Sequence, residues 1–246
     1  MADDLTVALF NGRELRGAGP WHFVRRTQPD VMCGHGFGDL AALVAADALD
    51  LEDALRLAVL REQLIATANE EIAGGMLAIV GPDAASAACR IAERCGVHIA
   101  RHDSPTRIVV SGSHERLGRA RAVAAEIGVE VGDVQAPGSL HCAALSECAD
   151  AFATALEQVA FRTPKVPVYS SVTAEPIVDP RSELARCLQE PVMWCDTVRA
   201  LEAVGAVRFV ESGGGSVLGD LVSETLCSRP AGAGDDAARG SEHAHA

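Results

Sequence analysis

The chain has 246 residues, of which 48% are apolar, and its formal net charge is −13. This apolar content can form the core of one or two domains, whereas the negative charge argues against general nucleic-acid binding, which requires a basic surface. No apolar stretch is long enough to span a bilayer and we identify no signal peptide, so the sequence predicts a cytoplasmic protein without membrane contact. The eight cysteines include no C-x-x-C pair, which predicts reduced thiols and no metal site.

The first functional signal lies near residue 30. A short apolar strand, residues 30–33, leads through the glycine-rich turn 33–38 into an apolar helix, residues 39–44. This outline predicts a nucleophile elbow, a sharp strand-to-helix turn that exposes one side chain above a helix N-terminus. Gly36 occupies the central position, where a nucleophile belongs. A purely structural strand-to-helix corner is the alternative interpretation.

The elements that follow predict two units of different character. Leucines at helical spacing in residues 48–73 predict an amphipathic helix that starts near Asp50. In residues 75–135, strands at 76–80, 97–101, 107–111 and 129–134 and helices at 82–94 and 114–127 are expected, which is the βαββαβ order of a ferredoxin-like unit. Helices near 145–159, 182–188, 195–204 and 216–226, with strands near 166–169 and 207–210, return to an α/β core.

We therefore expect an α/β fold with an inserted subdomain. Residues 1–74 and 136–227 form an α/β-hydrolase-like core around a parallel sheet, and residues 75–135 form the ferredoxin-like subdomain. Residues 228–246, rich in Ala, Gly, Asp and Ser, are predicted to be a disordered tail.

Several short segments carry a more specific signal. They are residues 34–43 (GHGFGDLAAL), 60–65 (LREQLI), 75–81 (GMLAIVG), 103–112 (DSPTRIVVSG), 138–145 (GSLHCAAL), 167–173 (PVYSSVT), 190–194 (EPVMW) and 209–218 (FVESGGGSVL). In this order they resemble the malonyl-CoA:acyl-carrier-protein transacylase family, which includes the acyltransferase domains of polyketide synthases.

The resemblance implies a ping-pong acyl transfer without a tightly bound cofactor. An elbow serine takes the malonyl group of malonyl-CoA and passes it to the phosphopantetheine thiol of an acyl carrier protein. His141 matches the histidine that deprotonates the serine, and the position of Met193 implies that its backbone carbonyl orients that histidine. The N–H of Phe37 is implied as an oxyanion donor. Arg61 matches the arginine that grips the malonyl carboxylate, and His35 is assigned to substrate binding; an ordinary surface arginine is the alternative for Arg61.

The chain departs from the family within these segments. Gly36 stands where the family has its serine, so the standard acyl-enzyme is not expected to form. Asp103 and Arg107 replace an asparagine and a glutamine of the family, and Gly214 replaces a proline. The resemblance therefore implies an acyltransferase homologue with impaired catalysis.

The amino-terminal part also differs from the family. Family members carry a longer segment before the elbow, which opens with a strand and a Gly-Gln-Gly loop that supplies an oxyanion donor. We expect this strand to be missing, which leaves a gap in the sheet unless residues 1–10 replace it. By resemblance, residues 5–25 correspond to a helix, although Gly17, Gly19 and Pro20 disfavour a continuous one.

Alternatives to a simple loss of activity stay open. Cys33 or Cys142 is a possible replacement nucleophile, and a water next to Gly36, activated by His141, would make a weak thioesterase. A non-catalytic module that binds an acyl carrier protein or a synthase is the other alternative. Four basic residues of one predicted helix form either a docking surface for such a carrier or a solvated helix face: His114, Arg116, Arg119 and Arg121.

Overall fold

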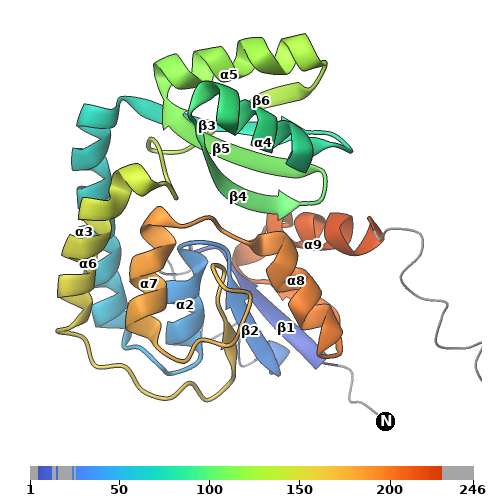
Figure 1. Ribbon diagram of the computed structural model, residues 1–246. Coiled ribbons are helices and arrows are strands. Elements are labelled where there is room, and N and C mark those ends of the chain that lie inside the picture. Colours follow the sequence, from blue (N-terminus) through green and yellow to red (C-terminus); the bar gives the residue numbers. More distant parts are fainter. Residues whose placement is uncertain (1–4, 13–14, 16–23, 25, 229–246) are drawn as a thin grey trace, which may run out of the picture.

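A computed structural model describes residues 5–12, 15, 24 and 26–228. In this part of the chain, two four-stranded sheets lie one above the other, and each has helices packed against it (Figure 1). The lower sheet is parallel and the upper sheet is antiparallel. The fold is therefore α/β, as the sequence predicts.

The parallel sheet has the strand order β7-β2-β1-β8. Its strands are β1 (Leu5–Phe10), β2 (Val31–Gly34), β7 (Val168–Tyr169) and β8 (Ala206–Glu211). Central β1 pairs with β2 on one side and with β8 on the other. Its residues 7–10 are buried because both faces of the sheet are covered, as is usual for parallel strands.

The position of β1 agrees with the alternative stated for residues 1–10, that they replace a strand of the sheet, and it corrects the helix expected for residues 5–25. The sheet has no gap where a strand was expected to be missing, because residues 5–10 form its central strand. The resemblance implied a helix for residues 5–25, but residues 5–10 form a strand. Residues 13–14, 16–23 and 25 of that segment lie outside the described residues, as do residues 229–246 of the predicted tail.

Helices cover both faces of the parallel sheet. One face packs on α2 (Gly38–Ala45), α3 (Leu51–Ile72), α6 (Ser146–Leu156) and α7 (Pro180–Gln189). The other face packs on α8 (Trp194–Ala203) and α9 (Val217–Cys227). Every residue of α2 is buried, which explains why its sequence is almost wholly apolar. Among the described helices, none is both long enough and apolar enough to cross a membrane.

The upper layer consists of β3 (Gly74–Val80), α4 (Ala84–Cys95), β4 (His98–Ser104), β5 (Arg107–Ser113), α5 (His114–Ile127) and β6 (Glu130–Val134). This is the βαββαβ order that the sequence predicts. The strand order is β4-β5-β3-β6, and all neighbours are antiparallel. Alternate apolar residues of β3 and β5 face α4 and α5, which close the top of the molecule in Figure 1.

A backbone link joins the edge of the upper sheet to the lower layer. The N–H of His102 donates to the carbonyl oxygen of Val192 (2.8 Å), and the N–H of Val192 donates to that of Ala100 (2.9 Å). Val192 lies two residues before Trp194, the first residue of α8. This link brings β4 next to the carboxyl ends of β1 and β2, where the candidate site lies.

Candidate active site

The predicted elbow forms between β2 and α2. Gly36 has a φ of +57°, and the N–H of His35 donates to the carbonyl oxygen of Phe10 (2.9 Å). A Cβ added to Gly38 would overlap that same carbonyl oxygen, so only glycine fits where α2 approaches β1 this closely. The turn therefore has the tight, left-handed geometry that an elbow requires.

The structure brings Gly36 and His141 together. A Cβ added to Gly36 would lie 3.4 Å from both Nε2 and Cε1 of His141 and 3.5 Å from Cγ2 of Val192. His141 is buried in the loop before the short 3₁₀ helix η2 (Ala143–Leu145) and has a left-handed backbone, with a φ of +53°. A side chain at position 36 would therefore point at the imidazole.

The acceptor that orients His141 differs from the prediction. Nδ1 of His141 donates to the carbonyl oxygen of Cys187 (2.7 Å), not to that of Met193. Cys187 belongs to the last turn of α7, whose carbonyls have no partner within the helix. The carbonyl oxygen of Met193 instead accepts bonds from the N–H and the hydroxyl of Thr197, each 2.9 Å long. The implied role of Met193 is therefore wrong, although a backbone carbonyl does orient the imidazole.

The protonation of His141 follows from these contacts. Because a carbonyl oxygen only accepts, Nδ1 carries the proton, and in the neutral ring Nε2 is left as an acceptor that faces Gly36. Burial, together with the positive charge of Arg61, lowers the pKa of His141 to about 3, although the bond to Cys187 acts in the opposite direction. The imidazole is therefore neutral at pH 7.

Arg61 is not a surface arginine. Its side chain is buried, its guanidinium lies 4.6 Å from the centre of the Phe37 ring, and its Nη1 donates to the Glu62 carboxylate (3.0 Å). Burial lowers the pKa of Arg61, and the charge of Arg61 contributes to the lowered pKa of His141. The N–H of Phe37 precedes the first turn of α2, where helices have backbone donors without intrahelical partners.

His35 connects the elbow to the upper sheet. Its Nε2 lies 3.0 Å from Oδ1 of Asp103, and its ring meets that of Trp194 edge-on at 5.3 Å. Oδ2 of Asp103 lies 3.1 Å from Arg101 and 3.4 Å from Arg107. Burial alone would raise the pKa of Asp103, but the hydrogen bond with His35 and the two guanidinium charges outweigh it and lower the pKa to about 2. The two charged replacements at 103 and 107 are therefore ion-pair partners.

Asp39 is a site residue that sequence reasoning missed. Its buried carboxylate accepts from the N–H of Gly34 (3.2 Å) and from the N–H (3.1 Å) and hydroxyl (2.6 Å) of Ser171. Burial raises its pKa to about 7, although these bonds act in the opposite direction. Asp39 ties the elbow to the loop after β7. An acidic residue inside the otherwise apolar segment 38–45 was the available signal.

The two cysteines considered as alternative nucleophiles are buried. Cys33 is fully buried in β2, and burial raises its pKa well above the usual range. Burial also raises the pKa of Cys142. Both side chains are protonated at neutral pH, and a protonated thiol is a poor nucleophile.

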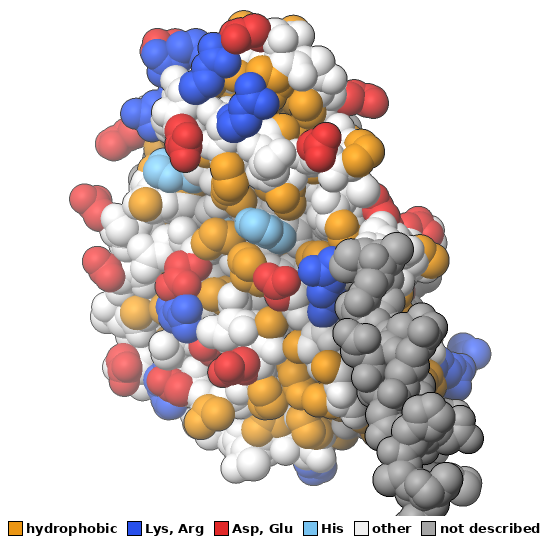
Figure 2. Space-filling model, turned by 45° about the vertical axis from the view of Figure 1, so that its right-hand side comes forward, with side chains coloured by type: hydrophobic (Ala, Val, Ile, Leu, Met, Phe, Trp, Pro, Cys, Tyr) orange, Lys and Arg blue, Asp and Glu red, His pale blue; other side chains and the backbone are white. Residues whose placement is uncertain are grey.

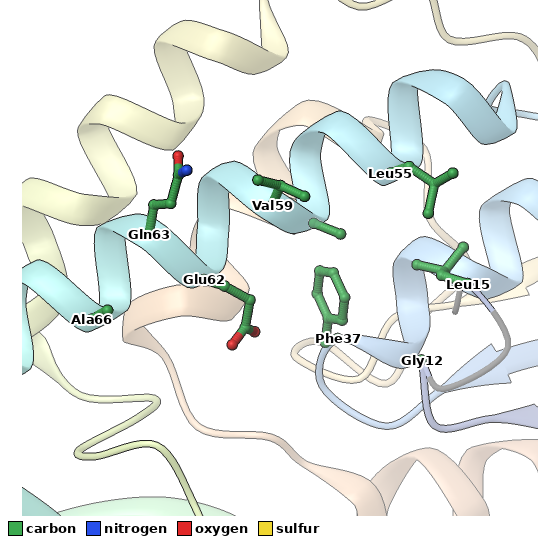
Figure 3. A pocket seen from close by; sticks show the side chains of 9 residues that line it. Gly12, Leu15, Phe37, Leu55, Val59, Glu62, Gln63 and Ala66 are labelled. Carbon is green, nitrogen blue, oxygen red and sulfur yellow. The ribbon is translucent and has the colours of Figure 1, made fainter. Parts of the chain in front are cut away.

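The two residues next to Gly36 in the sequence line two different cavities. Phe37 lines an apolar cavity of about 390 Å³, seen in Figure 3, whose other wall is one face of α3. His35 lines a polar cavity of about 530 Å³ together with charged residues of β4, β8 and α9. Across the described part of the chain, there is no group of three or more His, Cys, Asp or Glu side chains that could hold a metal ion.

The basic residues of α5 are largely engaged in local contacts. Arg116 donates to the carbonyl oxygen of Gly96 (2.9 Å), Arg119 lies 3.8 Å from Glu115, and Arg121 pairs with Asp133. Figure 2 shows Lys and Arg side chains interspersed with Asp and Glu side chains over this upper part of the molecule. Docking of a carrier protein on this surface stays a prediction.

Sequence comparison agrees with the geometry. Residues 13–241 match the acyl transferase domain family. The chain is 34% identical over 208 residues to the malonyl CoA-acyl carrier protein transacylase of Haemophilus influenzae, and the alignment covers 81% of this chain and 66% of that protein. It is 33% identical over 216 residues to the polyketide biosynthesis protein ThaF of Burkholderia thailandensis, covering 86% of this chain and 18% of that protein.

Solved structures show the same fold. The malonyl-CoA:acyl carrier protein transacylase of Xanthomonas oryzae pv. oryzae superimposes with a TM-score of 0.80 at 25% identity, covering 92% of each chain. The acyltransferase domain of an iterative polyketide synthase of enediyne biosynthesis superimposes with a TM-score of 0.77 at 28% identity, covering 90% of this chain and 63% of that one. The chain thus belongs to the acyl transferase domain family.

Proposed function

We propose that this chain is a homologue of the malonyl-CoA:acyl-carrier-protein transacylases that recognises acyl thioesters but does not form an acyl-enzyme. The observation that carries the proposal is the position of Gly36. A serine there would place its hydroxyl beside Nε2 of His141, which already has the tautomer of a base. Glycine supplies no atom to which an acyl group can be esterified.

The remaining site residues support recognition of the thioester. The N–H of Phe37 is suited to hold the thioester oxygen beside the elbow. The buried guanidinium of Arg61 lies on the Phe37 ring and is suited to bind a carboxylate on the acyl group. The relatives are named for transfer from malonyl-CoA to acyl carrier protein, so malonyl-CoA and a carrier's phosphopantetheine arm are the proposed ligands.

A cytoplasmic location is part of the same proposal. All eight cysteines are free, including the exposed Cys89 and Cys227. Exposed free thiols are typical of a reducing compartment, where disulfides rarely persist.

A second candidate activity is slow thioester hydrolysis. It is favoured by the acceptor nitrogen of His141, which faces the space left by Gly36 and can accept a proton from a water there. A free water is not held in a fixed position for attack as a serine hydroxyl would be, so we expect hydrolysis to be slow. Recognition without turnover therefore fits the geometry better.

The test is to restore the hydroxyl. Gly36→Ser is incubated with malonyl-CoA and its intact mass is measured; we expect a gain of one malonyl group on residue 36, while the native chain gains none. Gly36→Ala is the matched control, because it carries the same backbone strain, about 1–2 kcal/mol for a left-handed residue, without the hydroxyl. Acylation of the native chain, or a folded Gly36→Ser that stays unmodified, would contradict the proposal.

A further inference from the structure

The apolar cavity beside Phe37 is not explained by recognition of a malonyl group. Its volume is about 390 Å³, within the range of small-molecule sites, about 300–1,000 Å³. Figure 3 shows the Phe37 ring facing α3, with Leu15 and Leu55 on one side and Glu62 on the other. Except for Glu62 and Gln63, the side chains that line it are apolar.

The α3 wall of the cavity leaves apolar surface in contact with water. Leu55 and Val59 are 38% and 58% exposed. They are four residues apart, as are Glu62 and Ala66, so these side chains follow one face of the helix. Covering such a face with hydrocarbon is favourable because it removes apolar area from water.

The cavity adjoins the elbow through Phe37. Phe37, whose side chain forms one wall, directly follows Gly36, and its N–H is the proposed donor to the thioester oxygen. An acyl group whose carbonyl lies at this N–H therefore has its next carbon atoms close to the Phe37 ring.

The charge next to the cavity is already neutralised. Arg61 stacks on the Phe37 ring, and Nη1 of Arg61 donates to Glu62, which lines the cavity. A carboxylated acyl group has to compete with Glu62 for this guanidinium. An uncharged acyl chain leaves the pair intact and needs only apolar contacts.

We propose that this cavity binds the hydrocarbon part of a medium-length acyl thioester, so that the protein recognises uncharged acyl groups as well as a malonyl group. The inference rests on the thioester recognition at the elbow proposed above. It assigns to Leu55, Val59 and Phe37 the contacts with the hydrocarbon.

Calorimetric titration of the native chain with acetyl-CoA and octanoyl-CoA tests the inference. The two ligands differ only in chain length, and we expect octanoyl-CoA to bind roughly tenfold more tightly or better, because several methylenes leave water. Val59→Glu places a charge in the cavity mouth and is expected to abolish this difference. Val178→Glu is the matched control, since Val178 is 93% exposed and does not line the cavity, and it is expected to preserve the difference.

Equal affinities for the two thioesters, or a preference for octanoyl-CoA that survives Val59→Glu, would overturn the inference. If neither thioester binds, the proposed thioester recognition is wrong. Binding of hydrocarbon in the cavity is then tested separately with octan-1-ol, which contains no CoA. Shifts of amide resonances around Val59 on adding octan-1-ol, lost in Val59→Glu and kept in Val178→Glu, support the cavity by themselves. Their absence in the native chain refutes it.

Discussion

A Cβ at position 36 would lie 3.4 Å from Nε2 of His141, so a side chain at this position would adjoin the imidazole, and glycine provides none. The imidazole has its proton on Nδ1, held by Cys187, and its free nitrogen directed at the elbow. Burial keeps it neutral. The geometry of the base therefore does not depend on a hydroxyl at position 36, which is why we expect one substitution to restore acylation.

Glu62 provides a test of how Arg61 is used. In Glu62→Gln the guanidinium loses a charged partner, so a malonyl carboxylate no longer competes for it. Because the Glu62 side chain is 42% exposed, the ion pair is worth at most about 1 kcal/mol, which corresponds to about fivefold in Kd. We expect malonyl-CoA to bind up to fivefold more tightly and acetyl-CoA to bind unchanged, as measured by calorimetry.

Glu52→Gln is the matched control for this prediction, because Glu52 is exposed on the first turn of the same helix. It should leave both affinities unchanged. A tighter binding of both ligands in Glu62→Gln would show that Glu62 acts on the CoA part rather than on the carboxylate.

The site residues that could be predicted are those with a motif around them. Gly36, Phe37, Arg61 and His141 come from three separate segments, and the order of these segments along the chain matches a known family. Cys187 could not be found this way, since any residue of the last turn of α7 offers the same carbonyl and only tertiary packing selects one. The ion pairs of Asp103 likewise depend on contacts between elements.

The elbow itself depends on close contact between α2 and β1. A Cβ on Gly38 would overlap the carbonyl oxygen of Phe10, which is held in the centre of the sheet. Gly38→Ala must therefore displace backbone, and we expect it to lower the free energy of unfolding by about 2–3 kcal/mol. Urea denaturation measures this change.

For Gly118→Ala, in α5, we expect the opposite change in the free energy of unfolding. Gly118 lies inside this helix, and a Cβ there would meet no atom within 4 Å. We expect it to raise the free energy of unfolding by about 0.5–1 kcal/mol, because alanine is the better helix former. If Gly38→Ala were as well tolerated as Gly118→Ala, α2 and β1 would not be in the close contact described.

Long elements were easier to predict than short ones. The helix expected to start near Asp50 begins at Leu51, and the βαββαβ order is confirmed, because these segments have clear periodicity. Residues 5–10 form a strand of only six residues within a mostly apolar run. Periodicity does not show whether such a short run is a strand or a buried helix. Its place in the sheet is set by pairing with β2 and β8, which are distant in the sequence.

In the molecule as a whole, the site lies where the two sheets are joined. Val192 pairs with β4, and a Cβ added to Gly36 would be in contact with the Val192 side chain. His35, in the elbow, contacts Asp103 of β4. The loop that carries His141 also contacts the upper sheet, since the N–H of Leu140 donates to Oγ of Ser111 (3.1 Å). The packing of the two layers thus determines the geometry of the site.

The buried carboxylate of Asp39 predicts how stability depends on pH. Its pKa is about 7 in the folded protein and 3.8 is the usual value, so the folded state holds this proton more tightly. The stability that Asp39 contributes is fully present below about pH 4 and is lost as the pH rises through about 7. Asp39→Asn cannot titrate.

We therefore expect the stability difference between the native chain and Asp39→Asn to depend on pH. Relative to the native chain, Asp39→Asn should be less stable at about pH 5 than at about pH 8, by an amount on the order of 1–3 kcal/mol. Urea denaturation of both proteins at both pH values measures this difference. The same difference at both pH values would show that Asp39 does not titrate in this range.

The central claim is that this fold recognises acyl thioesters without transferring the acyl group. The direct measurement is a transfer assay in which the native chain is mixed with malonyl-CoA and a phosphopantetheine-bearing acyl carrier protein, and malonyl-carrier is quantified by mass spectrometry. We predict no more malonyl-carrier than forms without the chain. Formation of malonyl-carrier at a rate proportional to the concentration of the native chain would contradict the account.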